Sequence, residues 1–545
     1  MLIQKIKELI EGEVTVLESD LARYSHDASI FELKPEVVVF PKNSEDLKKL
    51  VIWVSKEKEK NPGISLTPRS AGTCMSGGSI TESILLDFTK FINKTLELGQ
   101  DYAIVEPGAY YRDFEKQTLQ HGLIMPSYPA SRAICAVGGM VGNNAGGEKS
   151  FVYGQVVDYV EGITAVLSDG NEYTFGPLTE SQVEDKIKRP TFEGQIYREI
   201  FGLIKDNFAE IMKAKPSTSK NSSGYLLWNV WDKKTFNLAK LFAGSQGTLG
   251  VITKIKFKLV RPKPKSELLV MFLNDLGDLG NIIKEVKSHN PESFEMFDDH
   301  TLKLALKLLP DLVKKMKGNT LSLMAKFLPE LWMAITGGIP KLILLAEFTG
   351  SDEQSVAKNL RAAQADIEKK FGIKTHITKS SEETQKYWIV RRESFNMLRM
   401  HSVGKITAPF IDDIIVHPYQ LPEFLPKLNE IFKKYPSLIY TIAGHAGDAN
   451  FHIIPLMDLS KQSERDIIPL LSEEVFTLVK EYDGSFSAEH NDGMIRGYYL
   501  EKMYGPQMLE IFKKTKHIFD PDNIFNPHKK TDATQEFSLS HIRRA

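Results

Sequence analysis

Short apolar runs alternate with polar and glycine-rich segments in the first half of the chain. Residues 37–40 form an uninterrupted apolar run that predicts a buried strand, and residues 47–60 then place apolar side chains at helical spacing. Ser44 is a suitable N-cap for this helix, and Glu45 and Asp46 complement the positive end of its dipole. Strand, helix and glycine turn in succession indicate an α/β beginning.

A different pattern follows the proline-rich stretch 261–264. Segments 267–273 and 342–348 are predicted strands, and segments 281–287 and 356–372 have the spacing of amphipathic helices. This pattern favours a second α+β domain with an antiparallel sheet. We therefore expect four parts: an N-terminal helical segment at 1–34, a ligand-binding domain at 35–262, a substrate or cap domain at 263–511, and a C-terminal segment at 512–545 that packs on the ligand-binding domain and ends in a loose tail.

Residues 301–340 stand apart within the second domain because they are rich in Leu, Met and Lys, with Pro310 and Pro329 dividing them into short amphipathic helices. A helical insertion that packs on the domain is the favoured interpretation. The alternative is a basic amphipathic surface that contacts a bilayer or a partner.

Composition narrows the class of protein. The 545 residues carry 69 Lys and Arg against 70 Asp and Glu, a net charge of -1, which argues against a nucleic-acid-binding protein. Two cysteines, Cys74 and Cys135, exclude a disulfide framework and an iron–sulfur cluster held by this chain's own thiolates. The N-terminus lacks the pattern of a signal peptide, and no apolar run is long enough for a transmembrane helix. We expect a cytoplasmic protein, with peripheral contact at the inner face of the membrane left open.

Three glycine-rich loops carry the first candidate chemistry: residues 68–78, 137–147 and 244–253. Small residues in the first loop leave backbone N–H groups uncovered, as in the nests that bind phosphates. Neither a Walker A loop nor the GxGxxG fingerprint is present. A single loop of this kind is usually a tight turn, but three in one domain favour a large cofactor with phosphate groups.

The order PRSAGTCMSGG, VEPGA, VGGMVGNNAGG, GSQGTLGVIT and the C-terminal NIFNP resembles the FAD-binding domain of the vanillyl-alcohol-oxidase (PCMH) type. Within that type it resembles the branch of the glycolate oxidase flavin subunit, D-lactate dehydrogenase and D-2-hydroxyglutarate dehydrogenase. The resemblance implies a two-subdomain FAD-binding domain and FAD held without a covalent bond, with Cys74 as a minor alternative. The implied FAD contacts are Pro68, Arg69, Ser70, Ala71, Gly72, Thr73, Ser76, Gly77, Pro107, Gly138, Gly139, Gly142, Asn143, Ile252 and Asn526.

The second candidate site combines histidines and a carboxylate. His445 and His452 flank Gly447 and Asp448, which permit a turn that lets the two rings converge, and Glu489 supplies an anionic side chain. Such a mixed set suits zinc, manganese or iron(II), although two histidines seven residues apart are a weak signal and ordinary hydrogen bonding is the simpler interpretation. The segments GHAGDANFH and EH resemble the metal motif of the same branch, which favours a divalent metal on His445, His452 and Glu489. Ala449 and Asn491 stand where that branch usually has glycine.

Cationic side chains would bind an acidic substrate. The segment YWIVRRE resembles the family element in which an arginine holds the substrate carboxylate, which assigns that role to Arg391, with Lys405 as a second candidate. A solvated helix face or loop is the alternative for both. His490, beside Glu489, is the candidate general base because an imidazole titrates near neutral pH.

Together these features predict an FAD-dependent, metal-assisted dehydrogenase that oxidises a small D-2-hydroxy acid to the 2-oxo acid. An external acceptor is then needed: an iron–sulfur protein, an electron-transfer flavoprotein, a quinone or dioxygen. We expect a homo-oligomer, of a size that the sequence leaves open. The rival predictions are a metal-free FAD oxidase of an alcohol or sugar, a flavin electron-transfer subunit and a nucleotide-binding regulator.

Overall fold

The computed structural model describes residues 2–307, 339–400 and 404–544, which form two compact units of mixed helix and sheet. The first unit contains the chain up to Gly146, then Gly154–Pro262 and Ser487–Arg543, and the second contains Gly147–Tyr153 and Lys263–Phe486. The predicted α+β class, with a C-terminal segment that returns to the ligand-binding part, is confirmed. We predicted from the sequence that the chain re-enters the ligand-binding part at residue 512, whereas in the structure it re-enters the first unit at Ser487.

The first unit begins with a four-stranded sheet of order β1-β2-β4-β3, in which β2, β4 and β3 are parallel. Its strands are β1 (Glu13–Thr15), β2 (Val37–Phe40), β4 (Ile84–Asp87) and β3 (Leu66–Arg69). Helix α3 (Ser44–Glu57) buries one apolar stripe in the same core cluster as these strands. Its N-cap is Asn43 and not Ser44, because the extended backbone of Asn43 lets the side-chain oxygen accept a hydrogen bond from the N–H of Asp46.

The second sheet of this unit is antiparallel and has the order β5-β6-β11-β7-β8. Its strands are β5 (Thr95–Leu98), β6 (Tyr102–Val105), β11 (Val251–Lys258), β7 (Val160–Val166) and β8 (Glu172–Phe175), and a separate pair joins β9 (Pro177–Thr179) to β10 (Thr235–Asn237). Along β11 buried residues alternate with more exposed ones, as expected of a strand with one face in the core. Val166 and Val251 belong to the same core cluster as the first sheet, so the two sheets share one core.

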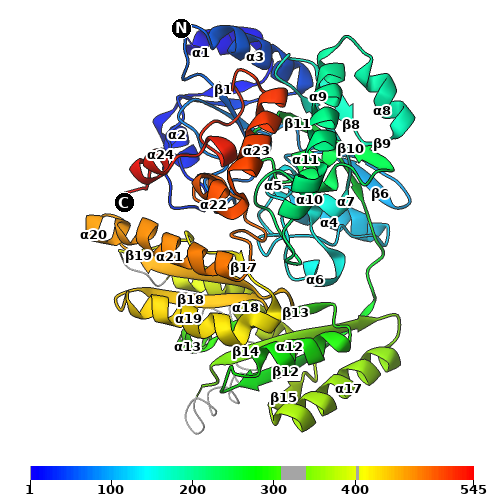
Figure 1. Cartoon of the computed structure of the whole chain (residues 1–545), viewed down its shortest axis with the longest axis vertical. Helices are drawn as coiled ribbons and strands as arrows, with labels where there is room; N and C mark the ends of the chain where they lie inside the picture. Colours follow the sequence, from blue (N-terminus) through cyan, green and yellow to red (C-terminus); the bar gives the residue numbers. More distant parts are fainter. Residues whose placement is uncertain (1, 308–338, 401–403, 545) are drawn as a thin grey trace. The chain divides into compact units, whose positions relative to one another are not determined.

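The remaining helices of the first unit surround these sheets. They are α1 (Leu2–Leu9), α2 (Glu18–Tyr24), α4 (Tyr111–Gln120), α5 (Val137–Asn143), α7 (Val156–Tyr159), α8 (Glu180–Ile187), α9 (Phe192–Asp206), α10 (Phe208–Ala214), α11 (Ala239–Phe242), α22 (Leu500–Tyr504), α23 (Pro506–Phe519) and α24 (Gln535–Ser540). The C-terminal segment is red in Figure 1. It contributes Ile524 and Phe525, both fully buried, to the core cluster of the first sheet. Phe525 also forms a parallel bridge with Leu66.

The second unit is built on one eight-stranded antiparallel sheet of order β15-β12-β14-β13-β18-β19-β16, with β17 also paired to β19. Its strands are β12 (Lys265–Leu273), β13 (Ser293–Asp298), β14 (Leu342–Gly350), β15 (Lys374–Ile377), β16 (Ile406–Thr407), β17 (Ile414–Ile415), β18 (Ile439–His445) and β19 (Asn450–Met457). The strands predicted at 267–273 and 342–348 thus lie next to each other as β12 and β14.

Helices cover both faces of this sheet (Figure 1). Alternate residues of β12 and β14, such as Leu268 and Ile343, pack with Trp388 against α13 (Asp299–Lys307) and α18 (Ser381–Met400). The other helices of the second unit are α6 (Ser150–Tyr153), α12 (Leu279–Ser288), α17 (Glu353–Phe371), α19 (Leu421–Lys433), α20 (Gln462–Arg465) and α21 (Ile467–Glu481).

Most of the predicted insertion at 301–340 lies outside the described residues, which include only the C-terminal turns of α13 and residues 339–340 of it. Among the helices of residues 2–307, 339–400 and 404–544, none combines the length and the apolar character needed to cross a bilayer.

Candidate functional site

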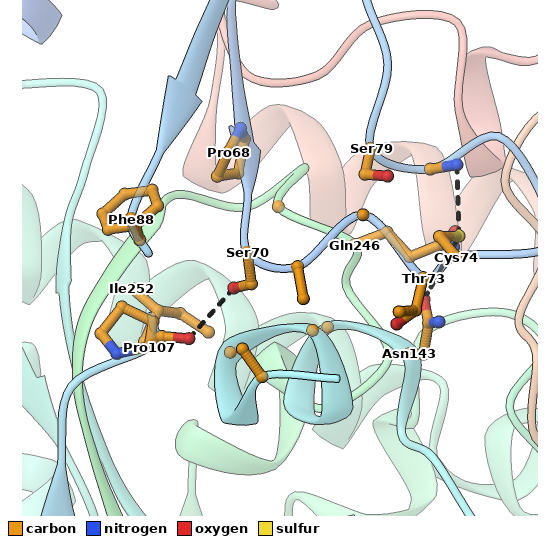
Figure 2. Close-up of a pocket in the computed structure, with 18 of the residues that line it drawn as sticks. Pro68, Ser70, Thr73, Cys74, Ser79, Phe88, Pro107, Asn143, Gln246 and Ile252 are labelled. Atoms are coloured by element: carbon orange, nitrogen blue, oxygen red, sulfur yellow. Dashed lines mark hydrogen bonds between the residues drawn. The ribbon is translucent and has the colours of Figure 1, made fainter. Parts of the chain in front are cut away.

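The three glycine-rich loops of the first unit converge on one pocket (Figure 2). Eleven of the fifteen residues predicted to contact FAD line it: Pro68, Ser70, Ala71, Gly72, Thr73, Pro107, Gly138, Gly139, Gly142, Asn143 and Ile252. The pocket is also lined by residues that the prediction left out: Cys74, Gly78, Ser79, Phe88, Ala136, Gln246, Gly247 and Gly250. Most of these additional residues belong to the same three loops, whereas nothing in the sequence singles out Phe88.

The second loop forms a short helix, α5, whose glycines lie on the pocket side. Val137, Met140 and Val141 bury the other side of α5 in the core. A Cβ atom built at Gly139 or Gly142 would have no heavy atom nearer than 3.8 Å, because it would point toward the pocket. The glycine side of α5 therefore leaves bare backbone against which a flat ligand can lie closely.

Four predicted contact residues, Arg69, Ser76, Gly77 and Asn526, are not among those that line the pocket. Arg69 donates to the carbonyl oxygen of Ser79 at 3.2 Å, and its guanidinium lies over the ring of Tyr24. The Ser76 hydroxyl accepts a 3.0 Å hydrogen bond from the amide of Gln246. The side chains of Arg69 and Ser76 therefore hold the glycine-rich loops in place and do not line the pocket.

Asn526, in the C-terminal NIFNP motif, also holds the glycine-rich loops in place. Its amide nitrogen donates to the carbonyl oxygens of Gly78 and Gln246, at 2.8 and 2.6 Å, and its side-chain oxygen accepts from the hydroxyl of Thr67 at 3.0 Å. The side chain is completely buried. Asn526 thus ties the first loop to the third, which explains why a residue so distant in sequence belongs with them.

Cys74 lines the pocket but has the surroundings of an unreactive thiol. Burial, reinforced by the nearby carboxylate of Asp27, raises the pKa of the Cys74 thiol above its ordinary value. A thiolate is the nucleophilic form, so this environment opposes reaction at the sulfur. Burial raises the pKa of Cys135 to about 12, in accord with a purely structural thiol.

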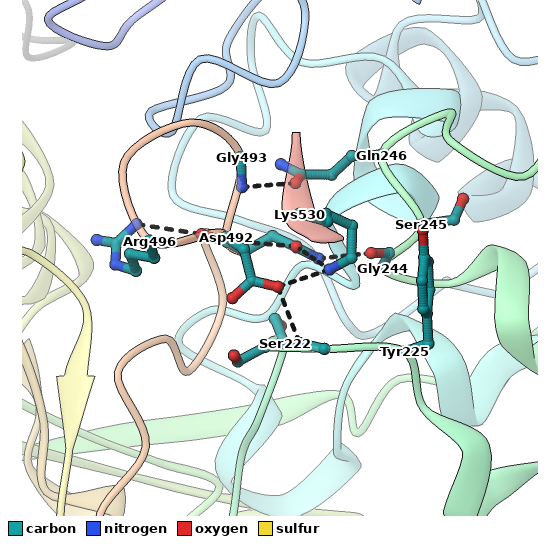
Figure 3. Close-up of polar contacts among 12 residues, drawn as sticks. Ser222, Tyr225, Gly244, Ser245, Gln246, Asp492, Gly493, Arg496 and Lys530 are labelled. Atoms are coloured by element: carbon teal, nitrogen blue, oxygen red, sulfur yellow. Dashed lines mark hydrogen bonds and ion pairs between the residues drawn. The ribbon is translucent and has the colours of Figure 1, made fainter. Parts of the chain in front are cut away.

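The turn that carries Glu489 and His490 is bound to the same loops by a buried polar network (Figure 3). Asn491 has a left-handed backbone, with φ 67°, which explains why asparagine can replace glycine here. Its amide donates to the carbonyl oxygens of Asn143 and Gly244, at 3.2 and 2.9 Å. The Lys530 ammonium donates to the side-chain oxygens of Asn491 and Asp492, each at 2.7 Å.

Glu489 and His490 are themselves held within the first unit. The buried ammonium of Lys220 donates to Glu489 Oε1 at 2.6 Å. A Cβ atom at Gly146 would lie 2.7 Å from that same oxygen, so only glycine leaves room for the carboxylate there. His490 is half-buried, and its carbonyl oxygen accepts from the Ser76 hydroxyl at 3.2 Å.

In the second unit, His445 and His452 lie on the paired strands β18 and β19. His452 is directly opposite Ala443, and His445 is opposite Asn450, so the two imidazoles are diagonal neighbours on one face of the sheet. Their ring centroids are 5.2 Å apart. The intervening turn, residues 446–448, ends in Ala449 with φ 53°, a conformation that costs an alanine about 1 kcal/mol. The family's usual glycine would avoid this strain.

A buried carboxylate lies beside each imidazole, and no sequence motif links either carboxylate to its histidine. His445 Nδ1 lies 2.6 Å from Oε1 of Glu295 on β13, and His452 Nδ1 lies 3.1 Å from Oδ1 of Asp412. Both carboxylates are almost completely inaccessible to solvent. Because a carboxylate accepts the Nδ1 proton, each ring would present Nε2 as the metal-binding nitrogen, the arrangement found in carboxylate–histidine–metal sites. Neither carboxylate has a spacing relation to its histidine, since Glu295 is 150 residues away in sequence.

The two neighbouring arginines of α18 have different partners. Arg391 is buried, and its Nε and Nη2 donate to Glu295 Oε2, at 3.0 and 2.9 Å. Arg392 is more exposed, donates to Glu148 from the same two nitrogens, and stacks over Trp388. The structure therefore joins Arg391, and not Arg392, to the histidine pair. Lys405 is partly exposed and lies directly before β16. Within the described residues, its side chain makes no hydrogen bond or ion pair with His445, His452 or Arg391.

Two protein-family models match this chain. The model described as the FAD binding domain matches residues 35–176, and the model described as the C-terminal domain of FAD linked oxidases matches residues 263–530. Together they span most of the chain.

Curated relatives extend over almost all of this chain. A D-2-hydroxyglutarate dehydrogenase of Pseudomonas putida is 26% identical over 92% of this chain and 49% of its own length. The glycolate oxidase subunit GlcD of Bacillus subtilis and the D-lactate dehydrogenase of Anaerostipes hadrus are each 25% identical over 97% of this chain, and over 97% and 96% of their own lengths. The chain thus spans about half the length of the first curated relatives it matches.

Solved structures share the fold at low sequence identity. The 4-ethylphenol oxidase of Gulosibacter chungangensis superimposes with a TM-score of 0.68 at 16% identity, over 98% of this chain and 97% of that one. The p-cresol methylhydroxylase structure gives a TM-score of 0.68 at 17% identity, over 97% and 96% of the two chains.

Proposed function

Because the chain belongs to the FAD-linked oxidases, in the branch of the glycolate oxidase flavin subunit and the D-lactate and D-2-hydroxyglutarate dehydrogenases, we propose that it oxidises a D-2-hydroxy acid to the 2-oxo acid. The observation that carries the proposal is the pocket formed by three glycine-rich loops, which suits the cofactor of this family. Lactate-like and 2-hydroxyglutarate-like acids are the substrate class.

The residues of the pocket fit FAD. The glycines of the first loop and of α5 leave backbone uncovered at the pocket surface, and Gly72 and Gly247 have positive φ angles that give the loops their tight curvature. Gly138 packs so closely on Pro107 that a Cβ atom would lie 2.5 Å from the proline ring, so the helix is held against the pocket wall. Bound FAD would supply the two-electron acceptor of the oxidation. The cofactor would be held without a covalent bond, in keeping with the buried thiol of Cys74, whose pKa burial raises.

The residues of the second unit fit a divalent cation such as zinc, manganese or iron(II). His445 and His452 are close together, and each is oriented by a buried carboxylate. The sequence motif adds Glu489 as the anionic ligand of this set. A bound cation would supply positive charge that favours ionisation of the substrate hydroxyl.

Three further side chains would act on the substrate. Arg391 would hold the substrate carboxylate and so orient the carbon that is oxidised, with Lys405 as a second cation for the same anion. The Nε–Nη2 edge of Arg391 donates to Glu295, which fixes the plane of the guanidinium that would meet the substrate. His490 would take the proton of the substrate hydroxyl.

The electrons would then pass to an external acceptor. With two cysteines, both buried, the chain has no thiolate cluster of its own to receive them. An iron–sulfur protein, an electron-transfer flavoprotein or a quinone would complete the cycle, and the functional form would be a homo-oligomer.

Turnover with a panel of D- and L-2-hydroxy acids and an artificial electron acceptor tests this proposal. We expect D-isomer oxidation that falls after treatment with a chelator and returns with one of zinc, manganese or iron(II). Activity that is insensitive to chelation would favour a metal-free oxidase of an alcohol or sugar. A yellow protein without activity toward any hydroxy acid would favour an electron-transfer subunit.

A further inference from the structure

We propose that Glu295 is a positioning residue that orients two members of the site at once, the imidazole of His445 and the guanidinium of Arg391. The inference rests on the proposed function, because it assigns His445 to a cation and Arg391 to the substrate carboxylate. It adds a residue that no sequence motif indicates.

The geometry divides the two oxygens of Glu295 between two partners. Oε1 lies 2.6 Å from His445 Nδ1, whereas Oε2 accepts from Nε and Nη2 of Arg391 at 3.0 and 2.9 Å. The side chains of Glu295, His445 and Arg391 are 2%, 5% and 8% exposed, so water competes little for these contacts. One carboxylate therefore joins β13, β18 and α18.

The position of Glu295 in the sheet explains how it can reach both partners. It precedes Phe297 by two residues on β13, so its side chain points to the same face as Phe297, which packs with residues of α18. β13 pairs with β18, in which Ala443 packs on that same face and precedes His445 by two residues. The acid therefore lies on the covered face of the sheet, below the helix that carries Arg391.

Each contact has a distinct chemical consequence. An acceptor at Nδ1 keeps the proton on that nitrogen and leaves the Nε2 lone pair directed to a cation, and it makes the ring a more basic ligand. On the arginine, the double contact fixes the plane of the guanidinium, because Nε and Nη2 belong to one rigid edge. Loss of Glu295 should therefore loosen both the metal ligand and the substrate clamp.

Asp412 provides a matched comparison. It contacts His452 Nδ1 as Glu295 contacts His445 Nδ1, and its replacement leaves the pair of Glu295 and Arg391 in place. Asp412→Asn should thus weaken metal retention without weakening the grip on the substrate, whereas Glu295→Gln should weaken both.

The experiment uses the full-length FAD-containing protein. Metal dissociation constants of the wild type, Glu295→Gln and Asp412→Asn are measured by competition with a chelator, and KM and kcat are then measured at saturating metal. Both variants should bind metal about 10- to 100-fold more weakly. Only Glu295→Gln should also raise KM, by about tenfold or more, because the arginine is displaced.

A double variant guards against misfolding, because Glu295→Gln leaves the buried Arg391 without its anion. Glu295→Gln combined with Arg391→Met removes both charges and should still show weakened metal binding, with FAD content and circular dichroism unchanged. Wild-type metal affinity or wild-type KM in Glu295→Gln would overturn the dual role and leave the proposed function intact. A wild-type protein that retains no metal would overturn the proposed cation site, and this inference with it.

Discussion

Single buried charges in the first unit are paired with partners far away in the sequence. Lys530 and Asp492 are both completely buried and are joined at 2.7 Å, and Asn491 accepts from the same ammonium. Since removing one partner leaves the other charge buried and unpaired, such contacts matter more for stability than exposed pairs do. They hold the turn that carries Glu489 and His490.

Lys530→Met should therefore destabilise the protein by about 3–5 kcal/mol, because Asp492 would keep a buried charge without its cation. Lys513→Met is the control: Lys513 pairs with Glu510 at 3.0 Å, but both side chains are about half exposed, at 48% and 61%. Its loss should cost less than about 1 kcal/mol. Urea unfolding followed by circular dichroism gives both values, and equal costs for the two variants would contradict the account.

Glu347 on β14 makes stability depend on pH in a direction opposite to that of most carboxylates. Burial, with added repulsion from Glu148 and Glu292, raises its pKa from 4.5 to about 7, although Lys149 and Arg392 act in the other direction. The folded protein keeps this proton up to about pH 7, whereas the unfolded chain releases it near 4.5. The stability contributed by this group is therefore present at low pH and is lost as the pH rises through this window.

Glu347→Gln should remove that dependence. Relative to the wild type, the variant should gain stability between pH 5 and pH 8, by about 2–3 kcal/mol for a pKa shift of this size. Unfolding by urea at a series of pH values provides the measurement. A stability difference that is the same at pH 5 and at pH 8 would show that Glu347 is already ionised at low pH in the folded protein.

The histidines, arginines and glycines of the site were predictable as individual residues, because they occur in short motifs with characteristic spacing. Glu295, Asp412 and Lys220 were not, because each meets its partner only after the chain has folded over long distances. A lone carboxylate in a strand or loop looks like any other in the sequence. The residues that hold a site in place therefore leave much weaker signals than the residues that form it.

At the scale of elements, the predicted strands and helices were found where periodicity was strong, as in α3, β12, β14 and α17. The second glycine-rich segment was predicted as a loop but begins with the helix α5. Val137, Met140 and Val141 anchor this helix in the core, although its three glycines disfavour helix. Tertiary packing thus overrides local propensity here. It also turns the bare side of the helix toward the pocket.

This arrangement predicts opposite effects on helix stability and cofactor binding. Gly142→Ala should favour α5 by up to about 1 kcal/mol, yet weaken FAD binding by about tenfold, because the new methyl group would occupy space at the pocket surface. Gly202→Ala in α9, where a Cβ atom would meet nothing within 4 Å, should stabilise its helix and leave FAD binding unchanged. FAD fluorescence on dilution measures the dissociation constants. If Gly142→Ala bound FAD as tightly as Gly202→Ala, the ligand would not lie against α5.

At the scale of the whole molecule, the sequence indicated the class of fold and the order of its main parts. It did not show that residues 147–153 join the second unit or that the chain returns to the first at Ser487. Both crossings depend on contacts between distant segments. At the return to the first unit, the carbonyl oxygen of Ser487 accepts a hydrogen bond from the N–H of Ser222. In the segment 147–153, Lys149 pairs with the buried Glu292 of the second unit at 2.7 Å.

Anaerobic mixing of the purified yellow protein with a D-2-hydroxy acid is the most direct test of the central claim. The account predicts that the visible absorption of the flavin is lost, that one equivalent of 2-oxo acid is formed per FAD, and that the L-isomer does neither. Retention of the flavin colour with every hydroxy acid, in protein that dithionite readily bleaches, would contradict the proposed function.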